Sequence, residues 1–118
     1  MSVPSSALAG VRIAEFGSYA AGPHIGKMLA NFGATVIHVE GPLRPDMVRY
    51  SAAPPGEWER PEETGGYFHQ QNRGKLSLTL ELSRGEARAL LVEVAAKCDV
   101  VVNNFSPRVM KNWGADYE

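Results

Sequence analysis

The fold is decided by one stretch of sequence, Val11-Arg12-Ile13-Ala14-Glu15-Phe16-Gly17-Ser18-Tyr19-Ala20-Ala21-Gly22-Pro23. Its first six residues predict a short buried strand, and Pro23 suits the first position of a helix. A strand that turns tightly into a helix N-terminus is where α/β proteins bind phosphate-bearing cofactors. Gly17, Gly22 and Gly26 lack the spacing of the dinucleotide fingerprint. The turn therefore fits either a nucleotide-type ligand or a plain turn in which glycine supplies a positive φ.

A helix and a second strand complete the unit that this stretch begins. Apolar residues recur at helical spacing after Pro23, and Gly33 ends the helix. Residues 35–39 are mostly β-branched, which is typical of a parallel strand covered on both faces. These elements predict a β-α-β unit with a right-handed crossover.

The middle of the chain lacks periodicity. Residues 41–66 contain five prolines and many charges, so we expect a long loop, which inside a compact domain is usually functional or disordered. Residues 67–72 then predict a helical turn that leads back to the sheet.

The second half repeats the alternation of strand and helix. Residues 76–82 alternate strictly, which predicts a half-exposed strand, and Ser83 with Glu86 predicts a capping box. The next helix has an apolar stripe, and residues 99–105 predict another buried strand. Pro107 begins a last short helix that ends near Gly114. The apolar stripe consists of Ala87, Leu90, Leu91, Val94 and Ala95.

This order of elements predicts an α/β fold, a Rossmann-like doubly wound parallel sheet. Four strands and about three helices can hardly cover both faces of such a sheet. The chain also ends directly after a βα unit, at Asp116-Tyr117-Glu118. We therefore expect the sheet to be incomplete and the chain to be truncated.

Composition excludes several classes of protein. The 118 residues carry a net charge of −1, which argues against general nucleic-acid binding. No apolar run approaches the length of a membrane span, and the first six residues lack the features of a secretion signal. A single cysteine, Cys98, excludes a disulfide framework and fits the cytoplasm, where we expect the protein to be. Cys98 lies at the C-terminal end of a predicted helix, where the partial negative charge of the helix dipole disfavours a thiolate, so it is a poor nucleophile.

Candidate ligand-binding residues gather where the predicted strands end. The segments 17–22, 40–46, 82–84 and 103–107 converge there if the sheet is parallel. Arg44 offers a cation, and the amides before Phe105 suit a purine ring or a pantetheine amide. The alternative is that these amides terminate a strand and that Phe105 belongs to the core.

Other polar residues are weaker candidates. The three histidines lack metal-ligand spacing, so we expect no metal site. Glu15 lies in a buried strand, where a paired structural carboxylate is favoured over a catalytic one. Arg73 and Lys75 precede a strand and are either phosphate ligands or ordinary surface cations.

The order of the segments resembles the amino terminus of the class III CoA-transferases. This family includes formyl-CoA transferase and carnitine CoA-transferase, and α-methylacyl-CoA racemase is a relative. The resemblance covers nearly the whole chain apart from the proline-rich loop. It rests on Leu8–Ile13, Ala21-Gly22-Pro23, Phe32–Glu40, Tyr67-Phe68, Asn72–Leu78, Asp99–Pro107 and Trp113–Glu118.

The resemblance implies a function for a longer protein. Residues 1–118 would be the N-terminal part of the large domain, with the proline-rich loop at 41–66. The whole enzyme would move CoA from an acyl-CoA to a carboxylic acid through an aspartyl-CoA thioester, as an interlocked homodimer. The nucleophilic aspartate lies beyond residue 118, so the resemblance implies that this segment is inactive alone. A racemase of the same fold and a non-catalytic CoA-binding or nucleotide-binding module are the alternatives.

The resemblance also implies which residues contact coenzyme A. The pair before Gly22-Pro23, the end of the third strand and the Asn-Phe-Ser motif carry over from the family. Gly41 stands where a basic residue is usual, so Arg44 is the substitute, and Ser18 and Tyr19 help to shape the acyl site. The expected cofactor-binding residues are Ala20, Ala21, Arg44, Lys75, Leu80, Glu81, Leu82, Ser83, Asn104, Phe105 and Ser106.

Overall fold

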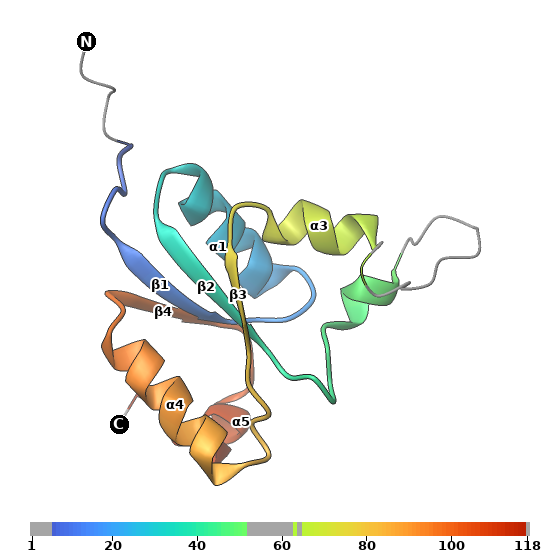
Figure 1. Ribbon diagram of the computed structural model, residues 1–118, viewed down its shortest axis with the longest axis vertical. Coiled ribbons are helices and arrows are strands. Elements are labelled where there is room, and N and C mark those ends of the chain that lie inside the picture. The colour runs from blue at the N-terminus through green and yellow to red at the C-terminus, as the bar shows by residue number, and fades with distance from the viewer. Residues whose placement is uncertain (1–5, 52–62, 64, 118) are drawn as a thin grey trace.

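One parallel sheet organises the protein. The computed structural model describes residues 6–51, 63 and 65–117. Its strands are β1 (Arg12–Phe16), β2 (Thr35–Glu40), β3 (Leu76–Thr79) and β4 (Val100–Asn103). They lie in the order β3-β2-β1-β4, and each neighbouring pair is parallel (Figure 1). The predicted α/β class with a parallel sheet is confirmed.

Helices cover the two faces of this sheet. Helices α1 (Ala21–Asn31) and α3 (Gly66–Asn72) lie on one side. Helices α4 (Gly85–Ala96) and α5 (Pro107–Asn112) lie on the other, as Figure 1 shows. A short 3-10 helix, η1 (Met47–Tyr50), falls within the expected loop 41–66. Residues 52–62 and 64 of that loop lie outside the described residues.

The alternation of side chains along β1 divides the core between the two faces. Ala14 and Phe16 pack with Leu91 of α4 and Met110 of α5. Ile13 packs instead in a second cluster with Val36 and Ala34. Because successive strand residues point to opposite faces, Glu15 shares the face of Ile13, which carries α1. The doubly wound arrangement follows from this division.

The strands at the two edges differ from their predictions. Val100 and Val101 are each 42% exposed, so the prediction of a buried final strand is wrong. The reason is position: β4 is the last strand of the described sheet, and it pairs with β1 only. At the opposite edge β3 ends at Thr79, three residues short of the predicted end at residue 82, although the N–H of Leu80 still donates to the carbonyl of Glu40.

Two of three local predictions at helix ends need correction. Helix α1 begins at Ala21, so Pro23 occupies its third position, where an amide N–H is equally dispensable. The expected capping box is wrong, because Arg84 is the N-cap of α4 and no side chain caps it. Ser83 instead lies in the preceding turn, where its N–H donates to Oε1 of Glu81. The stop at Gly33, with φ of 96°, is confirmed.

Candidate functional site

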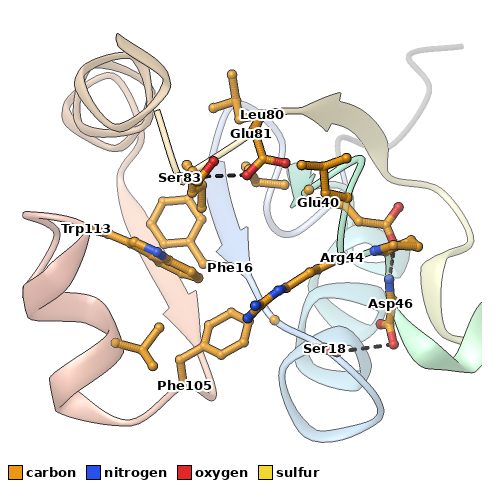
Figure 2. A pocket seen from close by; sticks show the side chains of 17 residues that line it. Phe16, Ser18, Glu40, Arg44, Asp46, Leu80, Glu81, Ser83, Phe105 and Trp113 are labelled. Atoms are coloured by element: carbon orange, nitrogen blue, oxygen red, sulfur yellow. Dashed lines mark hydrogen bonds between the residues drawn. The ribbon is translucent and has the colours of Figure 1, made fainter. Parts of the chain in front are cut away.

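A cleft of about 650 Å³ opens at the carboxyl ends of the strands (Figure 2). Phe16, the last residue of β1, and Val39, the last but one of β2, line it. Leu43–Asp46 form one side, Leu80–Ser83 form another, and Phe105 with Trp113 forms a third. The predicted convergence of segments from distant parts of the sequence is thus observed. We call this hollow the carboxyl-end cleft.

An aromatic pair and a cation face each other across the cleft. The rings of Phe105 and Trp113 meet edge to face, with centroids 5.0 Å apart and planes at 75°. Figure 2 shows the side chain of Arg44 extended across the cleft toward Phe105. An aromatic face can stack on a nucleobase, and a guanidinium can bind phosphate.

The segment after β3 offers backbone and a charged carboxylate. The N–H of Leu80 donates to the carbonyl of Glu40 at 3.0 Å, which fixes this segment against the end of β2. Hydrogen bonds from the side chain and backbone of Ser83 lower the pKa of Glu81. Glu81 is therefore an acceptor at the rim of the cleft at neutral pH.

The turn between β1 and α1 is fastened to β4 by one amide side chain. Ser18 donates its N–H to Oδ1 of Asn104 at 3.0 Å, and Nδ2 of Asn104 donates to the Ser18 carbonyl at 2.9 Å. A Cβ on Gly22 would lie 2.9 Å from Oδ1 of Asn104 and 3.0 Å from Cα of Gly17. Neither Gly17 nor Gly22 has a positive φ, so close packing is the reason that these positions require glycine.

The positive φ of this turn belongs to Tyr19, at 63°. The carboxylate of Asp46 accepts the Tyr19 N–H with both oxygens, at 3.1 and 3.0 Å, and also accepts from Oγ of Ser18 at 3.2 Å. We call these bonds the Asp46 clamp. Asp46 belongs to the predicted segment 40–46, but the sequence assigns it no role of its own. Its one available signal was its place two residues before Val48, whose N–H it also accepts as the N-cap of η1.

Glu40 supports the same loop from the end of β2. Its carboxylate accepts the Asp46 N–H at 2.6 Å and forms an ion pair with Arg49 at 2.7 Å. The Arg49 guanidinium in turn lies 3.7 Å from the centre of the Phe68 ring. These bonds fix the segment that carries Arg44 and Asp46 to the sheet.

Lys75 lies away from the cleft. Its Nζ is 2.5 Å from Oε2 of Glu15, and it also donates to the carbonyl of Pro23 and to Oδ1 of Asn72 at 2.8 Å. The second oxygen of Glu15 is 2.8 Å from Nδ1 of His38, on the neighbouring strand. This cluster confirms that Glu15 is a paired carboxylate.

The surroundings of Glu15 in this cluster shift the pKa of its carboxyl group. Burial raises the pKa of Glu15, but hydrogen bonds from His38 and Lys75 outweigh it, so the pKa lies below its ordinary value. The carboxylate is therefore ionised at neutral pH. The ammonium of Lys75 is only 2% exposed and already has three acceptors, so the structure separates it from the other expected cofactor ligands.

The structure brings part of the expected cofactor set together. Six of those residues line the cleft, namely Arg44, Leu80, Glu81, Leu82, Ser83 and Phe105. Ala20 and Ala21 belong to the turn and first residue of α1, Asn104 fastens that turn, and Ser106 caps α5 by accepting from Val109 N–H. The sequence-based prediction missed four lining residues, which lie outside the predicted segments: Phe16, Val39, Val109 and Trp113.

The surroundings of Cys98 bear on the reactivity of its thiol. Burial raises the pKa of the Cys98 thiol, which agrees with the expectation of a poor nucleophile.

Within residues 6–51, 63 and 65–117, no three His, Cys, Asp or Glu side chains are grouped to hold a metal ion. Across the same described residues, no helix is both long and apolar enough to span a membrane.

Known proteins match this chain in sequence and structure. Succinate–glutarate CoA-transferase from Agrobacterium fabrum is 38% identical over 112 residues, which are 94% of this chain and 28% of that protein. Formyl-CoA:oxalate CoA-transferase from Bradyrhizobium diazoefficiens is 37% identical over 114 residues, 97% of this chain and 26% of that protein. A CAIB/BAIF family protein from Brucella suis superposes with a TM-score of 0.82 at 35% identity, over 96% of this chain and 29% of that one.

The chain thus spans between a quarter and a third of the length of these relatives. The model of one family matches residues 8–118, which include all four strands and the whole carboxyl-end cleft. The chain belongs to CoA-transferase family III.

Proposed function

We propose that the carboxyl-end cleft binds the nucleotide part of coenzyme A. The observation that carries this proposal is the pairing of an aromatic wall, Phe105 with Trp113, and a cation, Arg44, across one cleft. The adenine would stack against Phe105, and Arg44 would bind a phosphate. The backbone of Leu80–Ser83 offers polar groups to the remainder of the cofactor.

We propose further that the chain is the N-terminal part of the large domain of a longer CoA-transferase. The named relatives support CoA transfer between acids, and each is more than three times as long as the matched segment. The aspartate that would form the aspartyl-CoA thioester belongs to the remaining sequence, so residues 1–118 alone would be inactive. The exposed Val100 and Val101 suit a further covering layer, supplied by the rest of a cytoplasmic homodimer.

A turnover experiment on the full-length protein tests this proposal. The protein is incubated with succinyl-CoA and a series of carboxylic acids, and the appearance of new acyl-CoA is followed by chromatography. Transfer should occur without release of free CoA. A parallel reaction with 2-methylacyl-CoA in deuterated water detects a racemase, because deuterium then enters the α position. Deuterium exchange without transfer would contradict the transferase and favour the racemase.

A non-catalytic CoA-binding module predicts a third result. Such a protein would bind CoA but give neither new acyl-CoA nor exchange at the α carbon. The absence of CoA binding would contradict the cleft assignment itself. The binding and turnover measurements therefore separate the two parts of the proposal.

A further inference from the structure

The Asp46 clamp joins two segments that border the same cleft. Ser18 lies in the turn after β1 and Asp46 lies in the loop after β2, and both residues line the carboxyl-end cleft (Figure 2). The Asp46 side chain is buried, with the residue only 4% exposed. Its carboxylate accepts bonds from the Ser18 hydroxyl and from the Tyr19 and Val48 amides.

Tyr19 adopts a conformation that its own side chain disfavours. Its φ of 63° lies in the left-handed region, which is rare for a residue with a bulky side chain. Tyr19 is 56% exposed, so packing of the ring does not impose this conformation. Hydrogen bonds hold the peptide before Tyr19 at both ends: its N–H donates to Asp46, and the Ser18 carbonyl accepts from Asn104.

Asp46 is itself held in place by Glu40, which allows it to fix the conformation of Tyr19. The Asp46 N–H donates to Oε2 of Glu40 at 2.6 Å, and Nε of Arg49 donates to both oxygens of the same carboxylate. Glu40 ends β2, which pairs directly with β1. The clamp therefore connects the turn between β1 and α1 to the end of β2 through Glu40.

We infer that Asp46 is a positioning residue, which holds Ser18 and Tyr19 in the conformation that gives the carboxyl-end cleft its shape. The inference rests on the proposed function, because the ligand of the cleft is taken to be coenzyme A. Without the clamp the bond from Asn104 to the Ser18 carbonyl is left to oppose the strain at Tyr19. We then expect Tyr19 to move toward a negative φ, with rotation of the peptide between Ser18 and Tyr19. That rotation displaces the cleft wall at Ser18, next to the bound cofactor.

The test compares Asp46→Asn with a matched control in the full-length protein. An asparagine keeps the size of the side chain but replaces one acceptor oxygen with a donor that faces the Tyr19 N–H. The control is Asp99→Asn, because Asp99 also accepts a backbone N–H, from Arg12 at 2.8 Å, at the opposite ends of the strands. Calorimetry at a temperature where all variants are folded should show CoA affinity about tenfold weaker for Asp46→Asn. For Asp99→Asn the change should be less than about twofold.

A rescue experiment separates positioning from general support of the fold. Glycine adopts a positive φ without strain, so Tyr19→Gly removes the need for the clamp. In the Tyr19→Gly background, Asp46→Asn should weaken CoA binding by less than about threefold. Equal losses in the two backgrounds would overturn the inference. Wild-type affinity in the folded Asp46→Asn variant would overturn it as well.

Hydrogen–deuterium exchange provides a readout that does not depend on CoA. Peptides that contain residues 18 and 19 should exchange faster in Asp46→Asn than in wild type, and unchanged exchange would overturn the inference. If wild-type protein binds no CoA but exchange still responds to Asp46→Asn, the proposed function fails while the clamp stands. If Asp46→Asn does not fold, Ser18→Ala removes one bond of the clamp and should give a smaller loss of affinity in the same direction. Undiminished affinity in that variant would count against the clamp.

Discussion

The ammonium of Lys75 lies 2.5 Å from the carboxylate of Glu15, and both side chains are buried between the sheet and helix α1. Lys75 also donates to the carbonyl of Pro23, in the first turn of that helix. The pair thus connects three parts of the structure: the central strand β1, the segment before the edge strand β3, and the helix that follows the β1 turn. It organises the face of the sheet opposite α4 and α5.

Removal of one partner of this pair should destabilise the protein strongly. Lys75→Met leaves the ionised Glu15 carboxylate buried with His38 as its remaining partner, and loss of a buried partner costs about 3–5 kcal/mol. Urea unfolding followed by circular dichroism measures the loss. The matched control is Lys97→Met at the exposed end of α4, which should change the free energy of unfolding by less than about 0.5 kcal/mol. Equal effects of the two substitutions would contradict this account.

The same pair should give the protein an acid-sensitive stability. The pKa of Glu15 is lowered in the folded state relative to the ordinary 4.5, because bonds from His38 and Lys75 outweigh burial. The carboxylate therefore contributes stability that is present above the unfolded-state pKa and lost as the pH falls through the folded-state pKa.

A pH series of unfolding experiments measures that contribution. The difference in unfolding free energy between wild type and Glu15→Gln should be largest near neutral pH and should shrink below about pH 4.5. Glu86→Gln, at an exposed position on α4, serves as the control. A difference that stays constant from pH 7 to pH 3 would show that Glu15 is not ionised in the folded protein.

Gly26 should tolerate no side chain. A Cβ at this position would overlap Oε2 of Glu15 and lie 3.2 Å from Cε of Lys75, so Gly26→Ala displaces the ion pair. We expect a loss of about 1–3 kcal/mol, the usual range for overpacking, visible as a lower thermal midpoint. Gly66→Ala is the control, since a Cβ there meets no atom within 4 Å. A Gly26→Ala variant as stable as Gly66→Ala would show that helix α1 can move away from Glu15.

Cys98 should react slowly with alkylating reagents. Burial raises the pKa of its thiol, and the thiolate is the form that reacts. Iodoacetamide labelling at pH 7.5, followed by mass spectrometry, should be several times slower for the folded protein than for the same protein in urea. Equal rates would mean that the thiol is as exposed and as acidic as in an unfolded chain.

The fold was predictable because its signals are local. The β-branched run at residues 35–39, the stop at Gly33 and the helix start at Pro107 each depend on neighbours in sequence. The exposure of β4 was not predictable in this way, because an apolar strand has the same sequence at the edge of a sheet as at its centre. The capping box at Ser83 failed for a local reason, because α4 begins one residue later than predicted, with Arg84 as its N-cap, and Ser83 donates its N–H to Glu81.

The cleft was predictable in part for a different reason. Parallel strands bring their carboxyl ends to one edge, so Arg44, Leu80–Ser83 and Phe105 could be placed together from topology alone. Lys75 could not be placed, because its partners Glu15 and Pro23 are more than fifty residues away in sequence. The role of Asp46 depends on the conformation of Tyr19, which favours glycine and which no local pattern indicates.

Coenzyme A is proposed to bind in the carboxyl-end cleft against Phe105. The most direct test is calorimetric titration of CoA into the full-length protein and its Phe105→Leu variant, which keeps an apolar contact for Trp113 but removes the stacking ring. The matched control is Phe32→Leu, at the exposed end of α1. We predict that Phe105→Leu weakens CoA binding by about 1–3 kcal/mol and that Phe32→Leu leaves it unchanged. Wild-type CoA affinity in a folded Phe105→Leu variant would contradict the claim.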